Sequence, residues 1–280
     1  MEEEVEERAA VERLQVRKTY KLFAGGQFVR SESGRSYLAE GCNVPRASRK
    51  DLRDAVRVAR SAFPGWSGRT AMNRGQILYR IAEMLEGRRS EFLGLLGGGR
   101  RAGREVDAAI DTWVWYAGWT DKIAQVAGTV NPVGGPFFNF TVPEPTGVVG
   151  VVAPERPALL GLVRRLAPAL CGGNAVVALV SEPLPLAALT LAEVIATGDT
   201  PPGVVNILSG SRQELLPWLA SHMDVNAVDA TGCGDEELAA VEEAAAGNLK
   251  RVVRARADGL SPDAVTALME FKTVWHPIGV

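Results

Sequence analysis

The second half of the chain alternates apolar segments with helical ones, and this alternation limits the possible fold more than any other feature. It begins with GVVGVVA from Gly147 and NAVVALV from Asn174, continues with VVNIL and VNAVDA, and ends with a weaker segment, RVVRARA. Strands that are apolar throughout are buried on both faces, and helices between them favour right-handed crossovers in a parallel sheet. The sequence therefore predicts an α/β, doubly wound, Rossmann-like sheet of the nucleotide-binding type.

The first residues of the chain favour a helix followed by a hairpin. Residues 1–17 are strong helix formers, with Val5, Val11 and Leu14 loosely on one side. We consider two interpretations, a solvated helix with frayed ends and a helix that docks on a partner, and the thin apolar stripe favours the first. Residues 21–38 alternate around a Gly-Gly turn and predict a β-hairpin.

Three helical segments are predicted between this hairpin and residue 128. The first covers about 48–63, with Ser48 as its N-terminal cap and Pro64-Gly65 as its end. The second covers about 70–95, and the third, which is rich in Trp and Ala, spans roughly 103–127.

Two segments stand outside the strand–helix series. Thr129 to Val142 contains two short extended runs around Gly134-Gly135-Pro136, which is typical of a hairpin. The tail holds one extended run, Phe271 to His276, ended by Pro277, which fits an edge strand. We predict that the hairpin and this run form one small sheet and that the sheet is an interface, because two or three isolated strands are marginal in water.

Composition and charge exclude several classes of function. The net charge of −2 over 280 residues provides no field that would attract nucleic acid or a membrane, and neither is expected as a partner. Cys42, Cys171 and Cys233 are odd in number and scattered, which indicates reduced thiols in the cytoplasm, and no metal site is expected. The acidic N-terminus lacks the apolar core of a signal peptide.

Several segments, in the right order, resemble the aldehyde dehydrogenase superfamily over about residues 20–262. AIDTWVWYAGWTDKI, from Ala109, is similar to the helix before the family's oligomerisation arm. FFNFTVPEPTGVVGVVAP, from Phe137, resembles the arm as it returns to the first strand of the coenzyme fold. LAPALCGGNAVVALVSEPLP, from Leu166, and PPGVVNILSG, from Pro201, resemble the second and third strands with their flanking elements.

A narrower resemblance is to the non-catalytic second module of the sixteenth aldehyde dehydrogenase family. AAAGNLKRVVRARADG, from Ala244, is followed almost at once by FKTVWHPIG, as in that module. The resemblance implies a coenzyme-type domain and an arm, with the catalytic domain absent. The expected layout is a helical extension at 1–20, a Rossmann-like domain at 21–128 and 147–262, and the arm at 129–146 and 266–280.

The resemblance places four residues at the family's cofactor site. Glu182 corresponds to the acid that binds ribose hydroxyls, and Thr231, Gly232 and Cys233 correspond to the turn that faces the pyrophosphate. Leu179 stands where the family has a lysine. Asp235, Glu236 and Glu237 open the next helix, where they would cap it and repel a phosphate. We therefore interpret the four residues as a vestigial site: no cofactor is expected, although NAD remains possible.

The resemblance also implies that the catalytic groups are lost. The family's chemistry needs a cysteine nucleophile, an Asn oxyanion donor and a Glu base. Glu155 and Arg156 stand in place of the Trp-Asn pair, and Arg254 and Arg256 occupy the region of the base. No cysteine lies in a matching motif. Cys233, at a helix N-terminus, could still have a lowered pKa as a reactive thiol, but the neighbouring acids oppose this.

The expected function is that of an aldehyde dehydrogenase-like pseudoenzyme. Such a chain would be a structural or regulatory subunit that associates with itself or with a catalytic aldehyde dehydrogenase. Two alternatives stay open. Glu182 and Gly232 favour an NAD-binding sensor, and the family resemblance also allows part of an NAD-dependent aldehyde oxidoreductase whose nucleophile comes from a partner chain.

Overall fold

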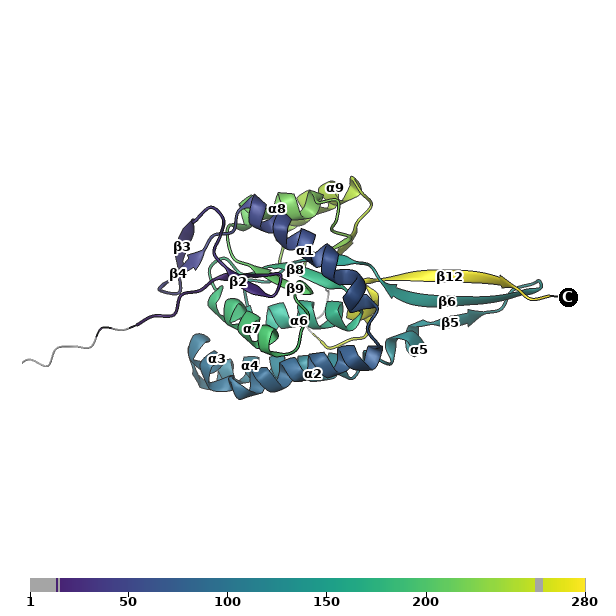
Figure 1. Ribbon diagram of the computed structural model, residues 1–280, viewed down its shortest axis with the longest axis horizontal. Coiled ribbons are helices and arrows are strands. Elements are labelled where there is room, and N and C mark those ends of the chain that lie inside the picture. Colours follow the sequence, from purple (N-terminus) through teal and green to yellow (C-terminus); the bar gives the residue numbers. More distant parts are fainter. Residues whose placement is uncertain (1–13, 15, 255–258, 280) are drawn as a thin grey trace, which may run out of the picture.

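The computed structural model describes Leu14 and residues 16–254 and 259–279, and a seven-stranded sheet lies at its centre (Figure 1). The strand order is β11-β10-β7-β8-β9-β1-β2. The first five run parallel, as predicted. They are β7 (Val148–Val152), β8 (Ala175–Leu179), β9 (Val205–Leu208), β10 (Ala227–Asp229) and β11 (Arg251–Val253).

Helices cover both faces of this sheet, which confirms the doubly wound arrangement. Along β7, Val149 and Val151 belong to one core cluster, whereas Val148 and Val152 belong to the other. Helices α6 and α7 pack on the first face, and α1 (Arg49–Ser67), α8 and α9 pack on the second (Figure 1). The crossover helices are α6 (Ala158–Cys171), α7 (Leu186–Thr197), α8 (Arg212–Ser221) and α9 (Asp235–Ala246).

The N-terminal hairpin is shorter than predicted and makes the sheet mixed instead of purely parallel. Strands β1 (Leu22–Ala24) and β2 (Gln27–Val29) flank Gly25-Gly26, whose φ angles of 62° and 77° suit glycine. Strand β1 pairs antiparallel with β9 and so extends the main sheet. The rest of the predicted hairpin belongs to a second one, formed by β3 (Ser36–Ala39) and β4 (Cys42–Pro45).

The first predicted helix begins where expected but ends later. Ser48 caps α1 (Arg49–Ser67) by accepting the N–H of Asp51, whose carboxylate accepts the N–H of Ser48 in return. Pro64 does not end the helix, because the buried Trp66 anchors the last turn and the N–H of Gly68 reaches the Pro64 carbonyl at 3.0 Å.

The other two helical predictions each cover two helices. The segment 70–95 is divided at Arg88, and the segment 103–127 is divided by a turn after Ala117. The helix predicted over 1–17 lies outside the described residues except at Leu14, Val16 and Arg17, where the chain is irregular. The helices are α2 (Ala71–Gly87), α3 (Arg89–Leu95), α4 (Gly99–Ala117) and α5 (Ile123–Ala127).

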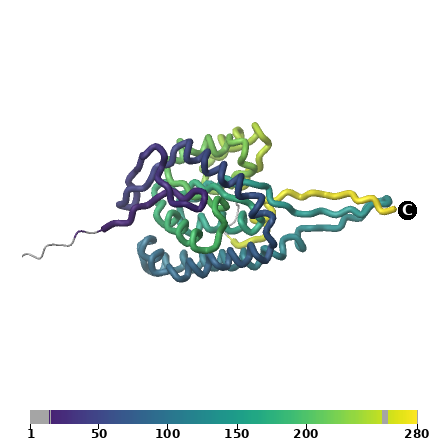
Figure 2. The backbone as a smooth tube through the Cα atoms, viewed as in Figure 1, coloured from purple at the N-terminus to yellow at the C-terminus, as the bar shows by residue number. Residues whose placement is uncertain are grey.

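A three-stranded sheet projects from the body, and it confirms the predicted pairing of the tail with the internal hairpin (Figures 1 and 2). We call this sheet the arm. Its strand order is β12-β6-β5, and all of its pairs are antiparallel. The short helix α10 (Asp263–Thr266) leads into it. The strands are β5 (Thr129–Asn131), β6 (Phe137–Pro145) and β12 (Met269–Pro277).

Candidate cofactor crevice

The strand order reverses between β7 and β10, and an open crevice lies at the carboxyl edge of the sheet there. Loops that leave adjacent strands in opposite directions create such a crevice. Its volume is about 610 Å³. The structure brings three of the predicted cofactor residues together in it, Glu182, Thr231 and Gly232. The other lining residues are Pro154, Glu155, Arg156, Arg212, Gln213, Gly234 and Glu237.

Gly232 has a packing role at the bottom of the crevice. Its N–H donates to the Val152 carbonyl at 3.0 Å. A Cβ at this position would lie 2.3 Å from the carbonyl oxygen of Ala153, so no larger residue fits without movement of the β7 backbone. The glycine is thus explained by contact with the strand end, without a ligand.

Thr231 is bound to a buried ion pair that the sequence analysis missed. Its hydroxyl donates to Asp229 Oδ1 at 2.5 Å, and its hydroxyl oxygen lies 3.2 Å from Arg165 Nη1. Arg165 Nη1 is 3.7 Å from Asp229 Oδ2, and both side chains are buried. Burial raises the pKa of Asp229, and the nearby Arg165 opposes this. In the sequence, an Asp at the end of an otherwise apolar strand could have indicated this ion pair.

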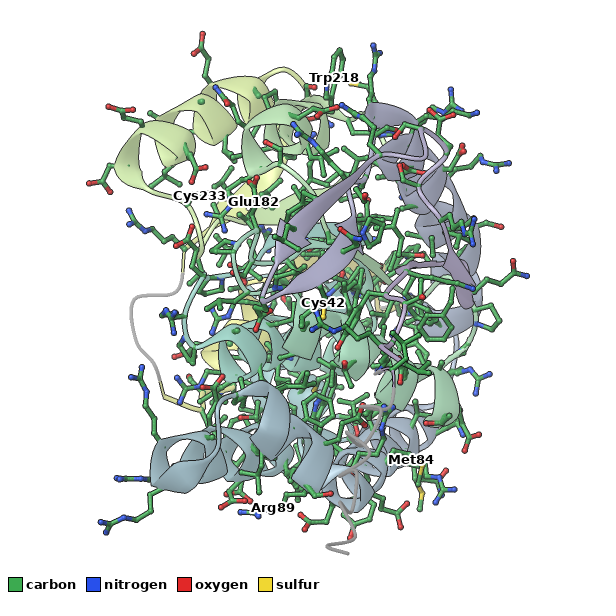
Figure 3. The ribbon with its side chains drawn as sticks, turned by 90° about the vertical axis from the view of Figure 1, so that its left-hand side faces the viewer. Cys42, Met84, Arg89, Glu182, Trp218 and Cys233 are labelled. Carbon is green, nitrogen blue, oxygen red and sulfur yellow. The ribbon has the colours of Figure 1, made fainter. Side chains whose placement is uncertain are left out.

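Cys233 is placed away from solvent and is not activated. The residue is 4% exposed, and burial, reinforced by the charge of Glu237, raises the pKa of its thiol to about 11. The direction is opposite to that of a reactive thiolate and agrees with the expectation that the neighbouring acids oppose one. Figure 3 shows Cys233 in the region of Glu182, with Cys42 apart from both.

Glu182 and Arg212 are joined by a hydrogen bond at the edge of the crevice. Glu182 Oε2 accepts the backbone N–H of Arg212 at 3.1 Å and so caps α8. The Arg212 guanidinium donates to the Gly232 carbonyl at 2.7 Å and to the Ala153 carbonyl at 2.9 Å. It also lies 3.5 Å from a carboxylate oxygen of Glu237. Sequence reasoning missed Arg212, because its contacts depend on residues far along the chain.

All four crossover helices have a carboxylate bonded to at least one N–H at or directly before their first turn. Glu105 accepts from two N–H groups at the start of α6, at 3.0 and 3.3 Å, and Glu40 accepts from the first residue of α7 at 3.0 Å. Glu182 does the same for α8, and Glu237 accepts from Gly234 at the start of α9. The predicted capping by Glu237 is confirmed. Helix N-termini attract anions, and here the protein's own carboxylates already occupy them.

Arg156 lines both the crevice and a smaller cavity beside it. This second cavity has a volume of about 160 Å³ and lies between α4 and the loop after β7. Glu40 also lines it, and burial raises the pKa of that carboxyl while the charge of Arg156 opposes the rise. At the position where the family resemblance expects an amide donor, the structure therefore presents a cation next to a carboxylate.

The family follows from comparison with known proteins. A model described as the aldehyde dehydrogenase family matches residues 37–271. The chain belongs to the aldehyde dehydrogenase family. It is 35% identical over 263 residues to retinal dehydrogenase 2 of Homo sapiens, covering 88% of this chain and 50% of that protein. It is also 35% identical over 250 residues to aldehyde dehydrogenase, cytosolic 1 of Elephantulus edwardii, covering 83% and 49%. This chain thus spans about half the length of these relatives.

A solved relative from Bacillus cereus, an aldehyde dehydrogenase in complex with NAD+, has the same fold. The TM-score is 0.78 at 27% identity, and the match covers 84% of this chain and 50% of that one. The crevice of the present chain differs from a free dinucleotide site in its charged groups, Arg212 and Glu237 among them. The Arg212 guanidinium joins the loops after β7 and β10, and Glu182 and Glu237 each accept one N–H at the starts of α8 and α9, so these two helix N-termini carry negative charge of the protein's own.

None of the helices in the described part of the chain combines the length and the apolar character that a membrane crossing requires. Within the same residues, no group of three or more His, Cys, Asp or Glu side chains could hold a metal ion.

Proposed function

We propose that this chain is an aldehyde dehydrogenase-like pseudoenzyme, a cytoplasmic structural or regulatory subunit that associates with itself or with a catalytic aldehyde dehydrogenase. The observation that carries the proposal is the arm. Its edge strand β12 is nine residues long, and no described strand pairs with its outer side. A long unpaired edge presents free N–H and C=O groups to another chain.

One face of the arm carries a group of apolar side chains open to solvent, next to the ion pair of Lys272 and Glu144. Val130, Phe140 and Val274 lie opposite one another in register on the three strands. Phe138 and Val142 extend this face along β6, and the exposed fractions of Val130 and Phe138 are 68% and 46%. A contiguous apolar face of this kind favours association, because burial against a partner removes it from water.

The opposite face of the arm is tied together by polar side chains. Asn131 Nδ2 donates to Asn139 and Thr141, and the hydroxyls of Thr141 and Thr273 are 3.0 Å apart. These contacts join all three strands, so the arm can hold its shape while the apolar face stays available. The same face also exposes Phe137, Phe271 and Trp275, so both faces of the arm offer apolar side chains to a partner.

The changes in the crevice support a subunit without chemistry of its own. Arg156 replaces the family's oxyanion donor, Cys233 holds a neutral thiol, and Arg212 lies in the crevice. The tail joins the arm soon after β11, which agrees with the resemblance to the second module of the sixteenth aldehyde dehydrogenase family. That module is non-catalytic, and we extend this property to the present chain as part of the proposal.

An NAD-binding sensor is the second candidate. The observation in its favour is that the crevice remains open, with Glu182, Thr231 and Gly232 gathered in it, while a solved relative binds NAD+. The carboxylates at the helix N-termini oppose it. The two candidates differ in one result: a sensor becomes more stable as the NAD concentration rises, and a pseudoenzyme of the proposed kind does not.

Association is tested with a charge placed on the apolar face. Val274→Glu puts a carboxylate where a partner would exclude water, so the variant should shift from oligomer to monomer in size-exclusion chromatography with light scattering. Leu38→Glu is the matched control, because Leu38 is 73% exposed on β3, away from the arm, and this variant should keep the oligomer. The proposal is contradicted if the unaltered chain is monomeric and also does not bind a catalytic aldehyde dehydrogenase.

A further inference from the structure

The Arg212 side chain joins two loops that belong to opposite halves of the sheet. The Ala153 carbonyl lies on the loop after β7, and the Gly232 carbonyl lies on the loop after β10. The strands themselves are neighbours, with Val151 opposite Asp229, but the chain turns away from each in a different direction. A single guanidinium therefore bridges the point at which a doubly wound sheet opens its ligand crevice.

The geometry of the bridge suits arginine in particular. The two Nη atoms donate separately to the two carbonyls, which a planar fork does without strain. The side chain is 13% exposed, and Glu237 lies 3.5 Å away to balance its charge. The Arg212 backbone is fixed as well, because its N–H donates to Glu182. Backbone, side chain and counter-charge are thus all held by residues of the crevice.

We propose that Arg212 is a positioning residue that takes the place of a dinucleotide in this crevice. It places a protein cation in the crevice and holds the loops after β7 and β10 together without any cofactor. The inference rests on the proposed function, because a subunit that serves as a scaffold needs a rigid crevice at every cofactor level. A dinucleotide that entered would have to break both carbonyl contacts and displace a largely buried, ion-paired guanidinium.

The first test uses the unaltered chain. Millimolar NAD should leave the melting temperature unchanged, because Arg212 lies in the crevice and carboxylates lie at the helix N-termini that would otherwise attract a pyrophosphate. A rise that increases with NAD concentration overturns the inference. This test needs no variant, so it decides whether NAD binds even if a substitution prevents folding.

The second test measures hydrogen exchange at the amides of Ala153 and Gly232, which bond to the Leu179 and Val152 carbonyls. In Arg212→Ala these amides should exchange about tenfold faster or more, because the two loops lose their bridge. Arg212→Lys should be intermediate, since one ammonium cannot serve both carbonyls as a fork does. Arg57→Ala, which removes an arginine 76% exposed on α1, is the matched control and should leave both amides unchanged.

Chemical rescue separates the bridge from a general packing effect. Guanidinium at low millimolar concentration should slow the exchange of both amides in Arg212→Ala, and sodium at the same ionic strength should not. Unchanged exchange in a folded Arg212→Ala, or rescue by both salts alike, overturns the inference. If the exchange experiments contradict the role of Arg212, the proposal that the chain associates through the arm still stands. If the chain does not associate, the exchange results on the two loops still stand, so the two proposals can fail separately.

Discussion

Glu105 is the residue whose role in capping is clearest, because it serves a helix far from it in the chain. It lies on α4 and accepts two N–H groups at the start of α6. Glu105→Ala should lower the free energy of unfolding by about 1–2 kcal/mol, since it removes a charged cap and leaves donors unpaired. Urea unfolding measures this change in the free energy of unfolding. Asp107→Ala, on the same helix but in an exposed pair with Arg89, should cost less than about 0.5 kcal/mol.

The cysteines give a prediction about pH. Burial raises the pKa of Cys171 to about 12, and burial with Glu237 raises that of Cys233 to about 11. Native iodoacetamide labelling at neutral pH, read by mass spectrometry, should therefore modify the partly exposed Cys42 and spare the other two. Rapid labelling of Cys233 at neutral pH contradicts this.

The raised pKa of Cys233 makes the stability of the folded chain depend on pH. The folded-state pKa of Cys233 lies above its usual value of 9.0, so the folded chain holds a proton that the unfolded chain releases as pH rises. The contribution is fully present below the unfolded value and is lost as pH rises through about 11. Cys233→Ser, whose hydroxyl does not titrate in this range, should show a smaller loss of stability between neutral pH and pH 11.

At the scale of single elements, the order and type of the helices and strands could be predicted from the sequence, but their boundaries could not. The strand–helix alternation after Gly147 has a strong period, and the structure follows it. Pro64 suggested an end to α1 because proline lacks an N–H, but the buried Trp66 lies beyond it and outweighs that loss. The pairing of β1 with β9 joins residues about 180 positions apart, as the bond from Gly25 to Asn206 shows (separation 181), and no local pattern reports such a contact.

Asn174 links the first crossover to the root of the arm. Its Oδ1 accepts the N–H of Gly147 at 2.9 Å, and its Nδ2 donates to the Leu268 carbonyl at 3.0 Å. Because the site is fully buried, Asn174→Ala leaves these groups unpaired and should cost about 2–4 kcal/mol in urea unfolding. Asn73→Ala on the exposed side of α2 should change the free energy of unfolding little. Equal effects of the two substitutions contradict this role.

At the scale of the whole molecule, the crevice was predictable only in part. Resemblance indicated Glu182, Thr231 and Gly232, and the doubly wound fold brings them to one edge. Arg212 could not be found this way, because it reaches carbonyls 59 and 20 residues away, and any residue type offers a carbonyl. The capping acids Glu40 and Glu105 were missed for the same reason, since each serves a helix that follows much later in the chain.

The central claim is that this member of the family is a scaffold that assembles through its arm. Hydrogen exchange along β12 tests it most directly, measured at low and high protein concentration and with a catalytic aldehyde dehydrogenase added. Association should slow exchange at the outer edge of β12 and leave β2, the edge of the main sheet, unchanged. Exchange along β12 that is the same at every concentration and with the added enzyme contradicts the account.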